Sequence, residues 1–180
     1  MTRWRAAVAA GATACVLVAG FVCRELARVG VHQGYAPAQP IAFSHKLHAG
    51  DSHVPCLYCH FGARTSRHAG IPPSAVCMNC HGLLQKQSED IEKLKELVAE
   101  RRPIAWIKVH NLPDFVYFNH SQHLLAAIDC QSCHGHVERM TRVEQQSPLT
   151  MGWCIQCHRS RQVSDPHTPA ANLDCGKCHY

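Results

Sequence analysis

The chain has 180 residues, of which 12 are cysteine and 15 are histidine, and its formal net charge is +5. Hydrophobic residues make up 46% of it, which is too many for an intrinsically disordered chain. Lysine and arginine are scattered rather than clustered, which argues against a nucleic-acid-binding protein. The composition indicates a folded chain that is organised by cysteine and histidine.

An apolar N-terminal segment predicts one membrane-crossing helix over residues 1–28. Residues 6–23 carry no charge, and Arg3 and Arg5 precede them. Eighteen helical residues span about 27 Å, close to the roughly 30 Å of a bilayer's hydrocarbon core. A cleaved secretory signal is the alternative, but we favour an uncleaved anchor, because the stretch is long for a signal and no small-residue cleavage site directly follows it. The basic N-terminal end is expected to stay in the cytoplasm, which places the linker (29–39) and the rest of the chain on the periplasmic or exterior face.

The ten other cysteines form five copies of C-x-x-C-H, the attachment sequence of c-type haem. Their thiols are Cys56, Cys59, Cys77, Cys80, Cys130, Cys133, Cys154, Cys157, Cys175 and Cys178. The proximal iron ligands are then His60, His81, His134, His158 and His179. Zinc ribbons and disulfide frameworks also use cysteine pairs, but neither requires a histidine directly after each pair. We therefore expect five covalently bound c-type haems in a cytochrome domain over residues 40–180.

A repeat upstream of the motifs supplies four distal ligands. The pattern F-x-H-x-x-H occurs at 43–48 and again at 118–123, displaced by 75 residues from His45 to His120. Each copy is followed by two attachment motifs, which defines diheme modules at 43–81 and 118–158. Histidines at i and i+3 lie on one face of a helical turn, so they cannot bind opposite sides of one iron and each should serve a different haem. The distal ligands predicted in this way are His45, His48, His120 and His123.

The fifth haem, attached at 175–179, needs another distal ligand. Met151 is the preferred candidate, and His110 and His68 are the alternatives. Methionine in place of a second histidine would raise the potential of that haem relative to its neighbours.

The connection between the modules contains a predicted helix over residues 88–102. Ser88 can cap it, acidic residues occupy its first turn, and Pro103 follows its basic end. Elsewhere the periodic runs are short. We expect a mostly irregular and α-helical multihaem cytochrome with little sheet. About 29 residues per haem are too few to enclose each group separately, so the haems should pack together and form most of the core.

With these motifs in place, the chain resembles the class III-type multihaem cytochromes. More closely, it resembles the pentahaem c-type cytochrome subunit of alternative complex III, a bacterial quinol-oxidising complex. The segments that carry the resemblance are PIAFSHKLHAG (40–50), SRHAGIP (66–72), VHNLPDFVYFNHSQH (109–123), SPLTMGWCIQCHR (147–159) and CGKCHY (175–180). The resemblance implies one membrane anchor and a complex with an iron–sulfur subunit, quinol-binding membrane subunits and a monohaem cytochrome. It also implies electron transfer from quinol to a soluble periplasmic acceptor.

The number of histidines favours an electron carrier over an enzyme. Each iron has a candidate distal ligand, so no coordination position need stay open for a substrate, and we expect no catalytic residue. Two alternatives remain. One is a stand-alone membrane-anchored quinol dehydrogenase cytochrome, and the other is a multihaem reductase, which would need an iron with an open position.

Overall fold

The computed structural model describes residues 2–27, 29–85, 88–161 and 171–180. The chain divides into two compact units, Met1–His32 and Gln33–Tyr180. The first holds the apolar N-terminal segment, and the second holds all five attachment motifs.

The first unit is a single helix, α1 (Thr2–Ala27). Its stretch Arg3–Leu26 has a mean hydropathy of 2.2, and none of it is buried within the protein. Twenty-four helical residues extend about 36 Å, which is enough to cross a bilayer. The helix predicted over residues 1–28 is therefore present and is long and apolar enough to span a membrane. A cleaved signal would have the same character, so retention of the helix stays a prediction.

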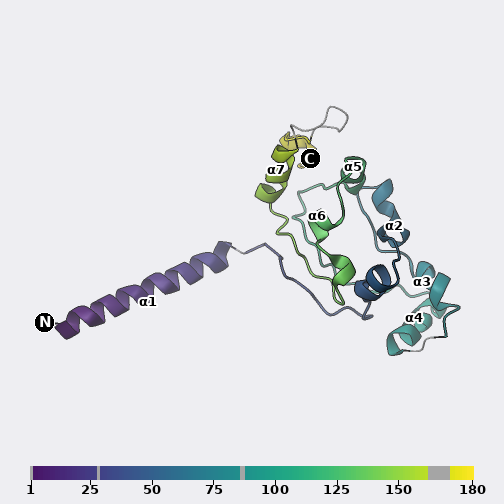
Figure 1. Ribbon diagram of the computed structural model, residues 1–180, viewed down its shortest axis with the longest axis horizontal. Coiled ribbons are helices and arrows are strands. Elements are labelled where there is room, and N and C mark those ends of the chain that lie inside the picture. The colour runs from purple at the N-terminus through teal and green to yellow at the C-terminus, as the bar shows by residue number, and fades with distance from the viewer. Residues whose placement is uncertain (1, 28, 86–87, 162–170) are drawn as a thin grey trace. The chain divides into compact units, whose positions relative to one another are not determined.

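The second unit consists of short helical turns joined by extended loops (Figure 1). Its elements are η1 (Lys46–Asp51), α2 (Cys56–Cys59), η2 (Phe61–Arg64), α3 (Ser74–His81), α4 (Glu89–Ala99), α5 (His120–Leu125), α6 (Gln131–His134), η3 (Val137–Arg139), α7 (Met151–Ser160) and η4 (Cys175–Lys177). The described residues contain no β-strand. The predicted mostly irregular and α-helical fold is confirmed.

The connector helix α4 begins where the sequence predicts and ends earlier. The Ser88 hydroxyl accepts a hydrogen bond from the Ile91 amide at 3.2 Å, so the predicted N-terminal cap is confirmed. The helix stops at Ala99 rather than at 102, because Arg101 adopts a left-handed backbone with φ of +55°. Ile91 and Leu94 are buried, and α4 packs against α3.

Protein side chains alone make only a small apolar core in the described residues. The buried apolar residues there are Ile41, Ala63, Ile91 and Leu94. These four residues make a small apolar core for a unit that runs from Gln33 to Tyr180. That porphyrin supplies much of the apolar interior stays a prediction.

Among the described residues, the most completely buried side chain is polar. Gln145 has no solvent exposure, and all its hydrogen-bonding groups are used. Its backbone amide donates to the Tyr35 carbonyl at 3.1 Å, and its carbonyl accepts from the Gly34 amide at 2.7 Å. Its side chain accepts from the Asn111 amide at 2.9 Å and donates to the Ser147 carbonyl at 3.0 Å. Gln145 thus joins three segments that lie far apart in the sequence.

Candidate haem-iron centres

Each attachment motif lies on a helical turn. The histidine amide donates to the carbonyl of the first cysteine at 2.9 Å in His60–Cys56, His134–Cys130 and His179–Cys175. The two other motifs lie within α3 and α7. None of the twelve cysteines forms a disulfide. The motifs therefore present two free thiols and an imidazole from a single turn, as covalent haem attachment requires.

The four histidines of the repeat each face a motif histidine. The ring centres are 6.4 Å apart in His45–His60, 6.1 Å in His48–His81, 6.4 Å in His120–His134 and 6.0 Å in His123–His158. Metal–imidazole bonds of about 2 Å on both sides of one iron place two ring centres about 6 Å apart. The spacing therefore fits an iron between the two imidazoles of each pair.

The pairing has the same order in both modules. The first histidine of the repeat faces the first motif of its module, and the second histidine faces the second motif. The ring planes of the first pairs are nearly parallel, at 3° and 7°. Those of the second pairs are twisted, at 57° and 47°. The sequence repeat is thus also a repeat in structure.

The phenylalanine of the repeat orients both histidines beside it. The Phe43 ring stacks on His48 at 4.2 Å and meets His45 edge-on at 4.9 Å. Phe118 has the same arrangement with His123 at 4.3 Å and an edge contact with His120 at 4.8 Å. One aromatic ring therefore limits the rotation of two candidate ligands.

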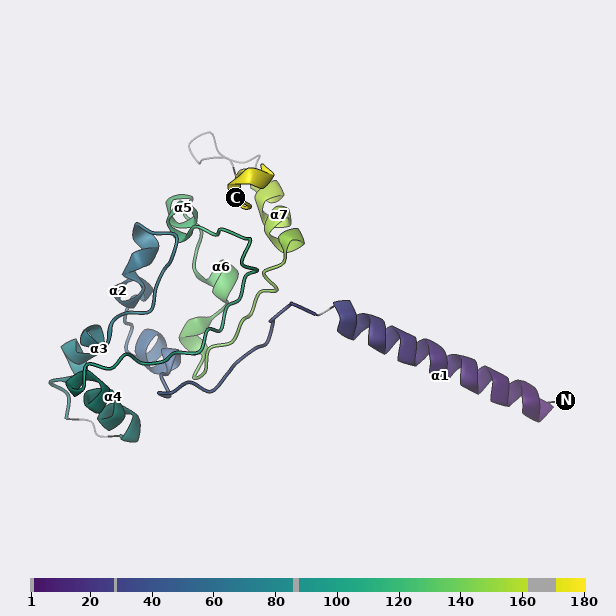
Figure 2. The ribbon, with the colours of Figure 1, turned by 180° about the vertical axis from the view of Figure 1, so that it is seen from behind.

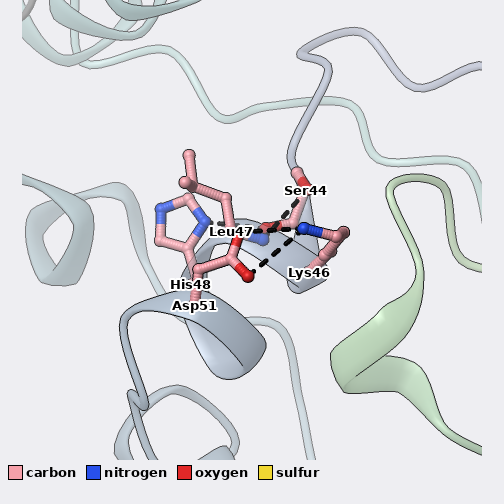
Figure 3. A network of polar contacts seen from close by, with 5 residues as sticks. All are labelled: Ser44, Lys46, Leu47, His48 and Asp51. Atoms are coloured by element: carbon pink, nitrogen blue, oxygen red, sulfur yellow. Dashed lines mark hydrogen bonds and ion pairs between the residues drawn. The ribbon is translucent and has the colours of Figure 1, made fainter.

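The Nδ1 atoms of most of these histidines lie at hydrogen-bonding distance from backbone carbonyls. The His48 Nδ1 is 2.8 Å from the Ser44 carbonyl (Figure 3), and the His123 Nδ1 is 2.8 Å from that of Asn119. The other pairs are His60–Gly70 at 2.7 Å, His120–Arg67 at 2.8 Å, His158–Asn172 at 2.7 Å and His179–Phe115 at 3.0 Å. A carbonyl can only accept, so Nδ1 carries the hydrogen and Nε2 keeps the lone pair that binds iron.

Burial keeps two of the candidate ligands neutral. Burial and the nearby His60 lower the pKa of His45 to about 4. Burial and the nearby His110 lower the pKa of His134 to about 4. A neutral imidazole is the form that coordinates a metal.

His110, an alternative distal ligand for the fifth haem, lies beside a different motif. Its Nε2 is 3.0 Å from the His134 Nδ1, and the two rings meet edge-on at 4.4 Å. When His134 binds iron through Nε2, its Nδ1–H donates to His110. Spacing along the chain gives no sign of this contact, because 24 residues separate the two histidines.

The two other candidates for the fifth haem are exposed. Met151 is 70% exposed at the start of α7, and His68 is exposed in the loop after η2. Met151 lies one turn before Cys154 on the same helix. Burial raises the pKa of Cys154, and the neighbouring Cys178 thiol raises it further. Met151 is therefore on a helix that lies beside the fifth motif.

A bare metal ion fits this arrangement less well than haem does. Within the described ranges, no three His, Cys, Asp or Glu side chains converge on a common point. A structural zinc site would bring four ligands together. The paired imidazoles and free thiol pairs instead match the donor set of a covalently attached haem.

Comparisons with known proteins agree with this donor set. Residues 116–180 match the family described as cytochrome c7 and related cytochrome c. The chain is also 35% identical, over 102 residues, to the "Menaquinone reductase, multiheme cytochrome c subunit" of Nitratidesulfovibrio vulgaris. That match covers 56% of this chain and 48% of the relative, so the chain spans about half the length of the curated relative it matches. Both similarities are to cytochromes c, and the family match falls on the part of the chain that holds the last three attachment motifs.

Proposed function

We propose that this chain carries five c-type haems and relays electrons within a quinone-linked membrane complex. The observation that carries the proposal is the set of four imidazole pairs, each of which joins a motif histidine to a histidine of the repeat. When both sides of an iron are occupied by imidazole, a substrate has no position to bind. Such a centre suits electron transfer rather than bond chemistry, and this disfavours a multihaem reductase.

The protein's own residues hold and tune these centres. Each bound haem supplies an iron that changes between the ferric and ferrous states by one electron. The ten motif cysteines would anchor the porphyrins, and each paired histidine would bind the iron through its Nε2. The carbonyls that accept from Nδ1 fix the tautomer and make the imidazole a stronger donor to iron. Phe43 and Phe118 keep the rings in place.

We assign Met151 as the distal ligand of the fifth haem. Its helix neighbour Cys154 lies beside Cys178, and the Met151 side chain is exposed and accessible. His110 is a poorer candidate, because its Nε2 lies against His134. His–Met ligation would make this centre the one with the highest potential, all else being equal.

The membrane and the partners follow from α1 and from the similarities. We place α1 in the cytoplasmic membrane as a retained anchor, with the haem domain on the periplasmic or exterior face. The resemblance to alternative complex III implies an iron–sulfur subunit, quinol-binding membrane subunits and a monohaem cytochrome as partners. A soluble periplasmic protein would then accept the electrons that quinol releases.

The relative's name favours a second direction of electron flow, toward menaquinone. The same haem relay would serve either direction, because one-electron carriers are reversible. The direction depends on the potentials of the partners at the two ends of the relay. In both cases the chain is the carrier and the quinone site belongs to another subunit.

The test is to isolate the chain from its native membranes with whatever subunits accompany it. Mass spectrometry should show five haem additions on the chain, and other subunits should co-purify. Haem reduction by a menaquinol analogue would support quinol oxidation, whereas oxidation of reduced haem by a menaquinone analogue would support quinone reduction. Quinol oxidation by the chain alone would favour a stand-alone dehydrogenase and contradict the proposal.

A further inference from the structure

The segment of the first module that carries His45 and His48 packs against the second module. The helix η1, which carries His48, lies on η3, which follows the first motif of the second module. The Lys46 amide donates to the Met140 carbonyl at 2.8 Å. The approach is so close at Gly50 that a Cβ there would overlap the Glu138 carbonyl oxygen.

The corresponding segment of the second module, which carries His120 and His123, packs against the first module in the same way. The helix α5, which carries His120 and His123, lies on η2, which follows the first motif of the first module (Figure 1, Figure 2). The Ser121 amide donates to the Ser66 carbonyl at 3.2 Å. Ser121 follows the first histidine of its repeat just as Lys46 does in the other copy. The contacts between the modules are therefore reciprocal. In each, the histidine segment of one module touches the segment that follows the first motif of the other.

Residues that lie beside the two first motifs also meet at this junction. The His120 Nδ1 lies 2.8 Å from the Arg67 carbonyl, and the His120 amide donates to the same carbonyl at 3.2 Å. Arg67 follows the first motif of the chain, and His120 faces His134 of the third. The first and third centres therefore lie next to each other at the junction.

Within each module the two centres are also adjacent. His45 and His48 are one turn apart and share the ring of Phe43. The second module repeats this, because His120 and His123 are also one turn apart and share the ring of Phe118.

The fifth motif joins the fourth. The His158 Nδ1 lies 2.7 Å from the Asn172 carbonyl, three residues before Cys175. On its other side, the Cys178 carbonyl accepts from the Tyr117 amide at 2.9 Å. These contacts hold the last motif against the second module, next to its second centre.

We propose that the centres form a line in the order second, first, third, fourth and fifth motif, which differs from their order along the chain. This inference rests on the proposed function, in which all five motifs carry haem. The two ends of the line are the second motif on α3, beside α4, and the fifth motif on η4. Electron-transfer partners therefore exchange electrons with the haems of the second and fifth motifs. The haem of the first motif lies inside the line and passes electrons only to other haems of the chain.

The order can be tested in the haem-loaded full-length chain by raising the potential of one haem at a time through a substitution of its distal ligand. We call the altered centre the tagged centre. His48→Met and His45→Met replace the distal ligand of the second and of the first centre, and each raises the potential of its haem. A mild reductant then reduces the tagged centre first, which changes the low-temperature EPR lines of its direct neighbours. His136→Met is the matched control, because His136 is exposed and pairs with Glu138.

The proposed order predicts that the His48→Met tag changes the lines of one other centre and that the His45→Met tag changes those of two. The chain order predicts the opposite, two and one, and that result would overturn the proposal. A tagged haem that becomes high-spin still marks its centre, because its EPR signal is distinct. A structure of the unaltered haem-loaded protein gives a second answer, since the iron of the first motif must have those of the second and third as its nearest neighbours. Fewer than five haem additions by mass would contradict the proposed function rather than the order.

Discussion

His110 places its Nε2 3.0 Å from the Nδ1 of His134, with the two ring planes at 82°. For six other candidate ligands, the Nδ1 partner is a backbone carbonyl. The ligand His134 of the third centre instead bonds to a side chain, which a single substitution can remove. An imidazole nitrogen is also a more basic acceptor than a carbonyl oxygen.

Replacing His110 should change the potential of the third centre. His110→Phe removes the acceptor, weakens the donation of His134 to iron, and so raises that haem's potential. His110→Gln keeps an acceptor and should have a smaller effect. Spectroelectrochemical titration of the haem-loaded chain would resolve the shift. A high-spin haem in His110→Phe would contradict this account, because it would mean that His110 is itself an iron ligand.

Removing the ring shared by two ligands should loosen two centres together. Phe118→Leu loses ring contacts with His120 and His123, each worth about 0.5–1.5 kcal/mol. We expect a lower denaturation midpoint and broader EPR lines from the third and fourth centres. Phe115→Leu is the control, because the Phe115 ring lies against His179 and should affect the fifth centre instead. Broadening of a single centre in Phe118→Leu would contradict the shared role.

Removing the buried amide of Gln145 should destabilise the haem domain. Gln145→Leu leaves the Asn111 amide and the Ser147 carbonyl without the side chain they bond, at a cost of about 1–3 kcal/mol for each group. Thermal unfolding followed by haem absorbance would measure the loss. Gln122→Leu changes an exposed residue of α5 and should have little effect. Equal midpoints for the two variants would show that the Gln145 contacts do not hold the segments together.

A methyl group at Gly50 should push the two modules apart. The Cβ of Gly50→Ala would overlap the Glu138 carbonyl oxygen, so η1 must move away from η3. We expect a destabilisation of about 1–3 kcal/mol and a weaker interaction between the first and third centres. Gly152→Ala on α7 meets no atom within 4 Å and serves as the control. An unchanged EPR spectrum in Gly50→Ala would show that the junction tolerates the added methyl group.

Replacing Met151 should identify the fifth distal ligand. Met151→Leu removes the thioether, so the fifth haem should become high-spin while the four His–His centres keep their EPR lines. His68→Leu should leave all five unchanged, because His68 lies in the loop after η2 in the first module, whereas the fifth motif contacts the second. A high-spin centre in His68→Leu, with none in Met151→Leu, would transfer the assignment to His68.

Much of the site could be predicted from the sequence because its determinants are local. C-x-x-C-H places two thiols and an imidazole on one turn, and F-x-H-x-x-H places an aromatic ring beside two histidines one turn apart. Such arrangements depend on helical geometry over four to six residues and are visible without tertiary structure. The Ser88 cap and the helix after it follow for the same reason.

The contacts that escape prediction are those between distant segments. No motif or periodic pattern in the sequence predicts the hydrogen bond of His134 to His110 or the contact of Lys46 with Met140. Gln145 resembles an ordinary polar loop residue until its four partners are seen. The early end of α4 also depends on one left-handed residue, Arg101, whose side chain does not favour that conformation.

The junction between the modules has a consequence for how the protein matures. The Lys46 amide bonds to a carbonyl at Met140, so the first module lacks its packing partner until some ninety further residues have been synthesised. A chain that emerges N-terminus first therefore presents Cys56 and Cys59 while they are still unshielded. Covalent loading of the early motifs can then precede closure of the fold. The junction itself closes only when the residues around Met140 reach the first module.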